Sequence, residues 1–288
     1  MSTLIGSNTF LAAAVAPTFE RSTISSMVII ALFCVAVPFI LLAVMKTKLG
    51  GKVSSFFVGM GFYILFAMFA SALVNMILFH VPGLSSLLEK GADQTPIHPV
   101  FYGIYGAIIA GIVEELGKLF CFKTLDKIKR PGKQNALFAA FGHGAFETVA
   151  YGSSLLMGNV VLATMVNSIG LEEYLKKLGH SGAKLAAEKN VVLDLAKMPV
   201  SEHFITGSFF LITLFLQAAL GVLVYVSYKN VQRRHYLFIA MGLHILGYLP
   251  NYLTSTLKNP LLGLGLTAAV CLVTAYLTRL EYSKAELS

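Results

Sequence analysis

The chain has 288 residues, of which 56% are hydrophobic and only 12% charged, and its mean hydropathy is +0.75. Soluble domains carry about 25% charged residues, so this composition excludes an ordinary water-soluble protein. The net charge of +8 does not indicate nucleic-acid binding, because the Lys and Arg residues lie in short loops beside apolar segments, where they report membrane topology. We therefore expect a membrane protein whose partners include lipid and exclude nucleic acid.

The N-terminal region contains a short apolar stretch from Phe10 to Pro17 with no basic residue before it. A cleavable signal peptide begins with a basic region. We therefore interpret the first 26 residues, together with the span that follows, as an uncleaved anchor.

Seven apolar segments follow one another along the chain, each about 20 residues long, and a helix of that length crosses the ~30 Å hydrocarbon core of a bilayer. Charged residues, proline or glycine bound each segment. The sequence thus predicts an all-α polytopic bundle of about seven helices, seven or eight, forming a single membrane-embedded domain over residues 1–288. The predicted spans cover residues 27–45, 55–79, 99–122, 135–158, 204–228, 236–256 and 260–279.

Basic residues gather in alternate loops, after the first, third, fifth and last spans. The positive-inside rule places all four groups in the cytoplasm. We therefore predict a multi-pass protein of the cell membrane with its N-terminus outside and its C-terminus in the cytoplasm. The four groups are Lys46, Lys48 and Lys52; Lys123, Lys127, Lys129, Arg130 and Lys133; Lys229, Arg233 and Arg234; and Arg279 and Lys284.

Two adjoining segments do not fit the simple alternation of spans and loops. Residues 159–169 are apolar and continue the fourth span beyond one crossing, so they are either a re-entrant or interfacial segment or part of an eighth span. We favour the first alternative, since an eighth span would break the charge alternation downstream. Residues 170–202 contain Lys and Glu in near-equal number, which predicts an extracytoplasmic amphipathic insertion of one or two helices that breaks at Gly179–Gly182.

The third predicted span contains three ionisable residues, although a charged side chain at mid-bilayer costs several kcal/mol and tends to mark a functional site. Glu114 and Lys118 are four residues apart and share a helix face, while Glu115 points about 100° away. Two adjacent carboxylates repel one another, so they are a costly way to build a structural ion pair. We predict a functional role for this group.

Two later spans also contain ionisable residues. His143 and Glu147 are four residues apart on one face of the fourth span, and His244 lies in an apolar run of the sixth. Counted from the predicted cytoplasmic ends, Glu114, His143 and His244 each lie about nine residues, or about 13 Å, into their helices. Polar groups from three helices therefore share one depth, which predicts that they meet.

This combination of residues has two chemical interpretations. Two imidazoles and a carboxylate, here His143, His244 and Glu147, are able to hold Zn²⁺ with an open position for water, while another carboxylate acts as the base. Without a metal, a buried glutamate takes a proton from water and the imidazoles stabilise the oxyanion. Both interpretations predict hydrolysis within the membrane. Glycines near these groups would let the helices pack closely, namely Gly106, Gly111, Gly117, Gly142 and Gly144.

The order of these motifs resembles a known family. Glu-Glu-x-x-Lys on one span, Gly-His-Gly-x-x-Glu on the next and an isolated His on a late span are similar to the YhfC-like intramembrane proteases of glutamic or metallo type. These are related to CAAX-prenyl endopeptidases, bacteriocin-processing enzymes and PrsW-like proteases. The similarity extends from Pro38 to His244. It implies a multi-helix core in which the Glu114 and Glu115 pair activates water.

The same resemblance implies that His143, Glu147 and His244 complete the site, and the chain departs from the family pattern at two positions. Where relatives have a further His, this chain has Gln217, a poor metal ligand. Where relatives have Asn or Asp four residues after the last His, it has Tyr248, and Asn251 follows three residues later. We predict supporting polar roles for Lys118, Gln217 and Asn251.

The sequence thus predicts an endopeptidase that cuts a peptide or membrane-protein substrate in or near the bilayer, on its cytoplasmic side, with either Zn²⁺ or no cofactor. Two alternatives stay open. The departures at Gln217 and Tyr248 are compatible with a catalytically inactive binding or immunity-type protein. Buried charges also suit a proton-coupled transporter, although the sequence has no inverted repeat or pair of broken helices to support it.

Overall fold

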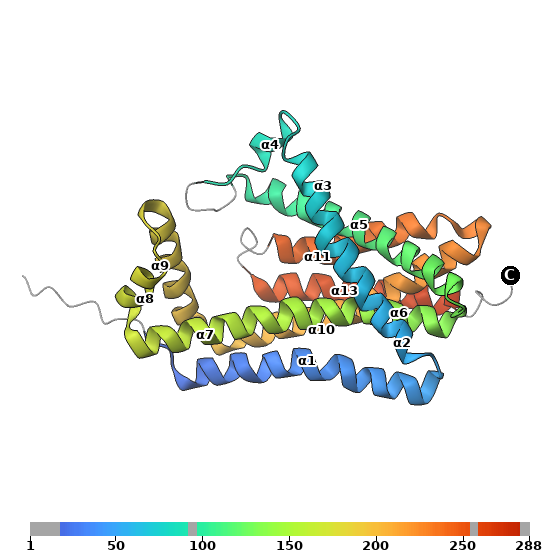
Figure 1. Cartoon of the computed structure of the whole chain (residues 1–288), viewed down its shortest axis with the longest axis horizontal. Coiled ribbons are helices and arrows are strands. Elements are labelled where there is room, and N and C mark those ends of the chain that lie inside the picture. The colour runs from blue at the N-terminus through green and yellow to red at the C-terminus, as the bar shows by residue number, and fades with distance from the viewer. Residues whose placement is uncertain (1–17, 92–96, 254–258, 283–288) are drawn as a thin grey trace, which may run out of the picture.

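The computed structural model describes residues 18–91, 97–253 and 259–282, and every regular element in these residues is helical (Figure 1). The apolar stretch from Phe10 to Pro17 lies outside the described residues. In chain order the elements are α1 (Arg21–Leu49), α2 (Val53–Tyr63), η1 (Ile64–Ala70), α3 (Ser71–Leu78), α4 (Leu84–Leu87), α5 (Pro99–Lys127), α6 (Lys133–Glu147), η2 (Thr148–Ser153), α7 (Ser154–Ile169), α8 (Leu171–Lys177), α9 (Gly182–Lys197), α10 (Val200–Lys229), η3 (Val231–Arg233), α11 (Tyr236–Tyr252) and α13 (Pro260–Tyr282).

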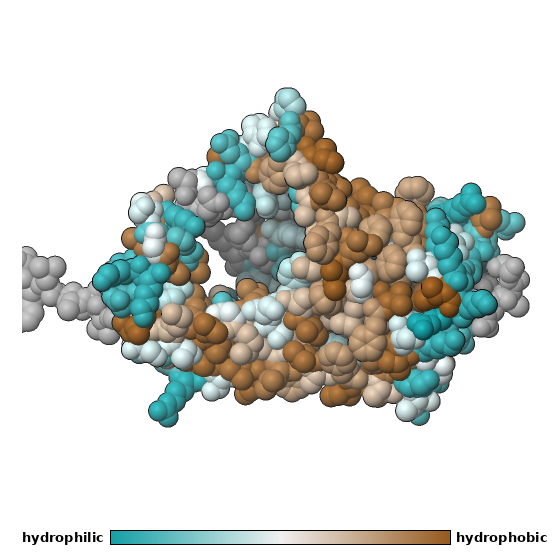
Figure 2. All heavy atoms as spheres, in the orientation of Figure 1, coloured by the Kyte–Doolittle hydropathy of each residue, from teal (hydrophilic) through white to brown (hydrophobic). Residues whose placement is uncertain are grey.

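The predicted membrane bundle of about seven helices is confirmed. Six continuous helical runs within the described residues are long and apolar enough to cross a bilayer: residues 21–49, 53–78, 99–127, 133–169, 200–229 and 260–282. The 17-residue helix α11 corresponds to the remaining predicted span and packs between α5, α10 and α13. Figure 2 shows hydrophobic side chains over the middle of the molecule and hydrophilic ones toward its two ends. The surface therefore has the banded character of a membrane protein.

Local sequence signals set several helix ends. Helix α1 ends at Gly50, whose φ of +73° suits glycine, and Lys46 and Lys48 in its last turn complement the negative end of the helix dipole. Helix α5 begins with Pro99 at its first position, where a missing backbone N–H does no harm. Charged or conformationally special residues thus stop the helices at the edges of the apolar runs.

Of the alternatives for residues 159–169, the re-entrant segment and the eighth span are wrong, while an interfacial position stays a prediction. The structure has neither a re-entrant turn nor an eighth span there, because α6, η2 and α7 form one continuous 37-residue helix from Lys133 to Ile169. At 1.5 Å per residue it is about 55 Å long, well beyond the hydrocarbon thickness. One face of its far end packs on protein: Ala163 and Val166 are buried against Met27 and Ile30 of α1, while Val161 and Met165 are exposed. This packing leaves no need for a second crossing.

Residues 170–202 contain the short helices α8 and α9, which are joined through Gly179 and project from the end of the bundle (Figure 1). Their apolar faces continue the cluster around α1 and α7, with Leu171, Leu175, Val192 and Leu195 all buried. The α8–α9 pair is thus docked on the bundle through one apolar face, while its charged residues lie on the outside.

The described members of the four basic groups lie at the other end of the bundle, while Lys284 lies outside the described residues. The backbone N–H of Lys52 donates to Asn135 at the start of α6, and Lys229 at the end of α10 pairs with Asp126 of α5 at 2.5 Å. Arg233, just after α10, pairs with Glu281 near the end of α13. Since these contacts connect four loops or helix ends, the groups form one basic end opposite the α8–α9 pair (Figure 1).

Helices α2, α5, α6, α10 and α11 surround the centre of the bundle, and two glycines let α2 and α6 touch through their backbones. A Cβ on Gly142 would lie 2.0 Å from the Phe56 carbonyl oxygen, and a Cβ on Gly59 would lie 1.9 Å from the Ala139 carbonyl oxygen. Side chains at these two positions are therefore excluded. This close approach brings α6, which carries His143 and Glu147, into the bundle interior.

Candidate active site

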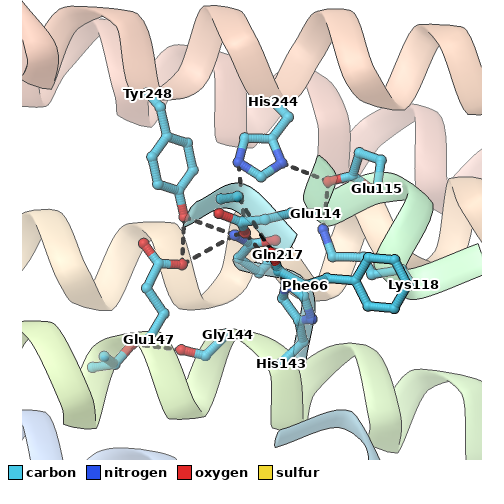
Figure 3. A network of polar contacts seen from close by, with 12 residues as sticks. Phe66, Glu114, Glu115, Lys118, His143, Gly144, Glu147, Gln217, His244 and Tyr248 are labelled. Atoms are coloured by element: carbon cyan, nitrogen blue, oxygen red, sulfur yellow. Dashed lines mark hydrogen bonds and ion pairs between the residues drawn. The ribbon is translucent and has the colours of Figure 1, made fainter. Parts of the chain in front are cut away.

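All five predicted catalytic residues, together with Lys118 and Gln217, are brought into one buried polar cluster (Figure 3). None is more than 6% exposed. Glu114 lies 13 residues, or about 20 Å, from the basic end of α5. His143 lies ten residues, or about 15 Å, from the start of α6, and His244 lies eight residues, or about 12 Å, from the start of α11. Although their depths differ more than the sequence predicted, the side chains still meet.

One part of the cluster is an ion triad on α5 and α11. Lys118 Nζ donates to Glu115 Oε1 at 2.5 Å, and His244 Nδ1 lies 2.5 Å from the same oxygen. A carboxylate only accepts hydrogen bonds, so His244 must carry its proton on Nδ1. In the neutral ring the lone pair is then on Nε2, and Glu115 fixes both the tautomer and the orientation of the imidazole.

Glu114 lies between the two imidazoles. Its Oε2 atom is 3.2 Å from His143 Nε2 and 3.9 Å from His244 Nε2, and the latter nitrogen has no hydrogen-bond partner among the described residues. The His143 ring also packs edge-on against the Tyr63 ring, with centroids 4.8 Å apart. Two electron-pair donors, His244 Nε2 and Glu114 Oε2, therefore face each other, an arrangement that suits a cation.

Gln217 connects the remaining polar groups. Its Nε2 atom lies 2.9 Å from Glu114 Oε2, 3.0 Å from Glu147 Oε2 and 2.9 Å from the Tyr248 hydroxyl, which itself donates to Glu147 Oε2 at 2.6 Å. An amide nitrogen has only two hydrogens for these three acceptors. Gln217 thus holds two carboxylates and a phenol in contact, and the site has more acceptors than donors.

The two departures from the family pattern are both part of this network. Sequence reasoning treated Tyr248 as a weakness, although its position four residues after His244 puts the two rings on one face, with centroids 4.5 Å apart. Tyr63 was not predicted at all, since an aromatic residue in an apolar span gives no signal of its contact with a distant helix. Asn251, one turn beyond Tyr248, lines the adjoining cavity.

A cavity of about 310 Å³ lies beside the cluster, on the side of Glu147 and Tyr248. Glu114, Glu147 and Tyr248 are in its wall, while Lys118 and Glu115 lie at the opposite side of the cluster, as Figure 3 shows. The other wall residues include three further tyrosines, Tyr63, Tyr151 and Tyr252. The cluster therefore faces a space large enough for part of a peptide.

The charges of the cluster bear on whether it suits a metal ion. With all three carboxylates ionised and both imidazoles neutral, the one lysine would leave a net charge of −2, and an uncompensated buried charge is strongly unfavourable. No three His, Cys, Asp or Glu side chains in the described part of the chain are close enough to hold a metal ion as they stand. The donor chemistry nevertheless fits a divalent cation, because His244 Nε2 is buried, unpartnered and directed toward a carboxylate.

Comparisons with known proteins agree with the motifs. The chain is 28% identical over 208 residues to an uncharacterized membrane protein, YhfC, from Bacillus subtilis (strain 168), a match that covers 72% of this chain and 76% of the relative. No solved structure matches. The family model described as YhfC intramembrane metalloprotease matches residues 33–262, which include every residue of the polar cluster. The chain therefore belongs to the YhfC intramembrane metalloprotease family.

Proposed function

We propose that the protein is an endopeptidase that hydrolyses a peptide bond of a membrane-associated peptide or protein within the bilayer. The observation that carries this proposal is the contact between Glu147, Tyr248 and Gln217 in the wall of a cavity, next to Glu114 and two imidazoles. Peptide hydrolysis needs a base for water, donors for the oxyanion and exclusion of bulk solvent. The cluster supplies all three.

Glu114, His143 and His244 are the residues that would hold the metal ion that the family description implies. This set differs from the sequence-based one, in which Glu147 was the carboxylate ligand, because Glu114 Oε2 is the atom that lies near both imidazoles. Imidazole nitrogen and carboxylate oxygen are usual ligands of Zn²⁺. When bound, such an ion supplies Lewis-acid polarisation and lowers the pKa of water.

Glu147 takes the role of general base in this proposal, since it lines the cavity and its Oε2 atom is held by two donors. Its carboxylate accepts a proton from the attacking water while the water oxygen bonds to the scissile carbonyl carbon. As Glu147 becomes protonated it releases the Tyr248 hydroxyl and the Gln217 amide, which then donate to the carbonyl oxygen as that oxygen becomes negative. When the C–N bond breaks, the proton moves from Glu147 to the leaving amine.

Glu115 and Lys118 act as positioning residues rather than as parts of the reacting group. Glu115 accepts from both Lys118 and His244 through Oε1 and is not in the wall of the cavity, whereas Glu147 is in that wall. We therefore assign water activation to Glu147, whereas the sequence-based prediction assigned it to the Glu114 and Glu115 pair. Holding an imidazole in one tautomer is a common task of such a carboxylate.

The orientation in the membrane follows from the basic end. We place this end in the cytoplasm by the positive-inside rule, which puts the start of α1 and the α8–α9 insertion on the extracytoplasmic side and the C-terminus inside. With lipid around the bundle, the substrate then reaches the site either from the bilayer or from one of the two aqueous faces.

The experiment is a cleavage assay in vesicles with a pool of synthetic transmembrane peptides, read by mass spectrometry. Wild-type protein should release defined fragments, and Glu147→Gln should reduce their rate of formation at least about 100-fold, since general-base catalysis contributes 10²–10⁴-fold. The matched control is Glu173→Gln on the exposed surface of α8, which should cleave at the wild-type rate. Equal rates for wild type and Glu147→Gln would rule out the proposed base.

A further inference from the structure

A second cavity adjoins the one at the polar cluster. It has a volume of about 280 Å³ and lies between α10, α11, α13 and the start of α7. Phe209, Phe210 and Asn251 are in the walls of both cavities. Because they share these wall residues, the inner and outer cavities lie in series, with the two phenylalanine rings at their junction.

The position of the outer cavity along α10 shows where it leads. Gln217 lies in the polar cluster. Counted from Gln217 toward the start of α10, Phe210 is seven residues or about 10 Å away, and Glu202 in the outer wall is 15 residues or about 22 Å away. Glu202 is the third residue of α10, just after α9 ends at Lys197. The outer cavity therefore opens at the α8–α9 end of the bundle.

The surface of the molecule is hollowed at the same end. Figure 2 shows a gap directly beside the α8–α9 pair, on the side that faces the rest of the bundle. The basic end also has a cavity, of about 440 Å³, between α5, α10 and α11, but it shares no wall residue with the inner cavity. Phe122, Leu220 and Leu223, each at most 1% exposed, pack in one core cluster on α5 and α10. The inner cavity therefore shares wall residues with the outer cavity and none with the cavity at the basic end.

The walls of the outer cavity define what would fit it. Leu155, Ile205, Phe209, Phe210 and Leu264 make them largely apolar. An extended peptide advances about 3.3–3.6 Å per residue, so the ~22 Å from Glu202 to Gln217 accommodates about six residues. A helix does not suit this role, since its carbonyl groups are already hydrogen-bonded and shielded from attack by water.

One charged residue in the outer wall adds a constraint on the occupant. Glu202 is partly buried and makes no ion pair with any residue that the structure describes. A carboxylate in largely apolar surroundings repels an acidic side chain and attracts a basic one. The outermost part of the path therefore disfavours Asp or Glu in a bound segment.

We propose that the two cavities form the substrate channel, which takes an extended apolar peptide segment of about six residues from the α8–α9 end, with a neutral or basic residue beside Glu202. This inference rests on the proposed function, because the bound peptide passes between the two cavities at Phe209 and Phe210, and its scissile bond then lies beside Glu147 and Tyr248. With the basic end in the cytoplasm, the substrate enters from the extracytoplasmic side, opposite to the cytoplasmic cut expected from the sequence.

Bulky substitutions in the outer cavity test the channel by blocking it. Thr206→Trp and Leu264→Trp place an indole in the wall of the outer cavity. The matched control is Leu266→Trp, because Leu266 is on the same helix as Leu264 but is 45% exposed on the outer surface of the bundle. The two channel variants should cleave the transmembrane peptide pool at least about 10-fold more slowly than wild type, and the control should cleave normally. Channel variants that are folded and cleave at the wild-type rate would overturn the proposal.

A labelling experiment tests the same channel without requiring catalysis. In a Glu147→Gln protein with Cys34, Cys121 and Cys271 replaced by Ala, Thr206→Cys should react with a membrane-impermeant maleimide added on the α8–α9 side, and an apolar hexapeptide should slow the reaction. Leu266→Cys should stay unreactive. A Thr206→Cys that reacts only from the basic side, or that the peptide does not protect, would overturn the channel.

The two experiments separate the failure of the channel from the failure of the proposed function. A wild-type protein that cleaves no peptide, combined with a Thr206→Cys that is labelled and protected as described, supports the channel as a peptide site and overturns the peptidase. Cleavage by wild type that persists in both Trp variants supports the peptidase and overturns the channel.

Discussion

At the scale of single residues, Tyr248 and Gln217 decide whether the site is complete. Both depart from the family pattern, yet both contact Glu147, and Gln217 also contacts Glu114. A buried carboxylate needs hydrogen-bond donors in any folded protein, and these two residues supply them to Glu147. In the proposed mechanism the same phenol and amide become the donors to the oxyanion.

The phenol of Tyr248 should matter mainly in the transition state. Tyr248→Phe removes the donor to the oxyanion but keeps the ring contact with His244, so we expect kcat to fall about 10²–10³-fold while KM changes little. Steady-state kinetics on one cleavable transmembrane peptide provides both constants. A kcat within threefold of wild type would remove Tyr248 from the mechanism.

Glu115 should affect both metal binding and folding, because Glu115→Gln also leaves the buried Lys118 ammonium without its ion pair. Loss of its charge in Glu115→Gln weakens the hold on the His244 tautomer, and substitutions of this kind cost about 10–100-fold in metal affinity. Competition with a chromophoric zinc chelator measures this affinity, with Glu173→Gln as the control. An unchanged affinity would indicate that His244 is not part of a metal site.

The cluster itself could be predicted from the sequence, because ionisable side chains in apolar membrane spans tend to face the interior of the bundle and pair with one another there. The pairing within it could not. Glu114 and Glu115 are adjacent, and which imidazole nitrogen each of them contacts depends on the rotation of α5 about its axis, set by packing against α11, α2 and α10. Likewise, the Tyr63 contact with His143 depends on the crossing of α2 and α6.

At the scale of helices, the glycine at position 142 allows the close backbone contact between α6 and α2. A Cβ there would lie 2.0 Å from a backbone oxygen that has no rotamer by which to move away. Gly142→Ala should therefore destabilise the protein by about 1–3 kcal/mol or more and lower activity by displacing His143. Thermal unfolding in detergent and the cleavage rate are the measurements.

Gly158 provides the matched control on the same continuous helix, since nothing lies within 4 Å of the Cβ that an alanine would add. Gly158→Ala should leave activity unchanged and stabilise the helix by about 0.5–1 kcal/mol. If Gly142→Ala were as stable and active as Gly158→Ala, close backbone packing of α2 and α6 would not be what positions the cluster.

The helix bounds show what a hydropathy pattern is able to predict. Apolar length located each of the six long apolar helical runs among the described residues. The re-entrant and eighth-span alternatives for residues 159–169 were wrong, because hydropathy does not distinguish side chains that face lipid from those that pack on α1. The two π-helical segments were also beyond prediction. They begin directly after Tyr63 and Glu147, two residues in the wall of the inner cavity, and such segments frequently occur at functional sites.

At the scale of the whole molecule, the separation of a basic end from the α8–α9 end predicts a fixed orientation in the membrane. In a background without native cysteines, Lys129→Cys should react with an impermeant thiol reagent only from the cytoplasm, and Lys177→Cys only from outside. Labelling of intact cells and inverted vesicles tests this directly. Reaction of both cysteines from one side would contradict the topology.

The central claim is that the buried cluster hydrolyses peptide bonds, and hydrolysis leaves a chemical record. Wild-type protein in vesicles made with H₂¹⁸O should produce fragments that carry one ¹⁸O atom in each new carboxyl group, as measured by mass spectrometry, while Glu147→Gln should produce none above background. Fragments without ¹⁸O, or the same labelled fragments from Glu147→Gln, would contradict the claim.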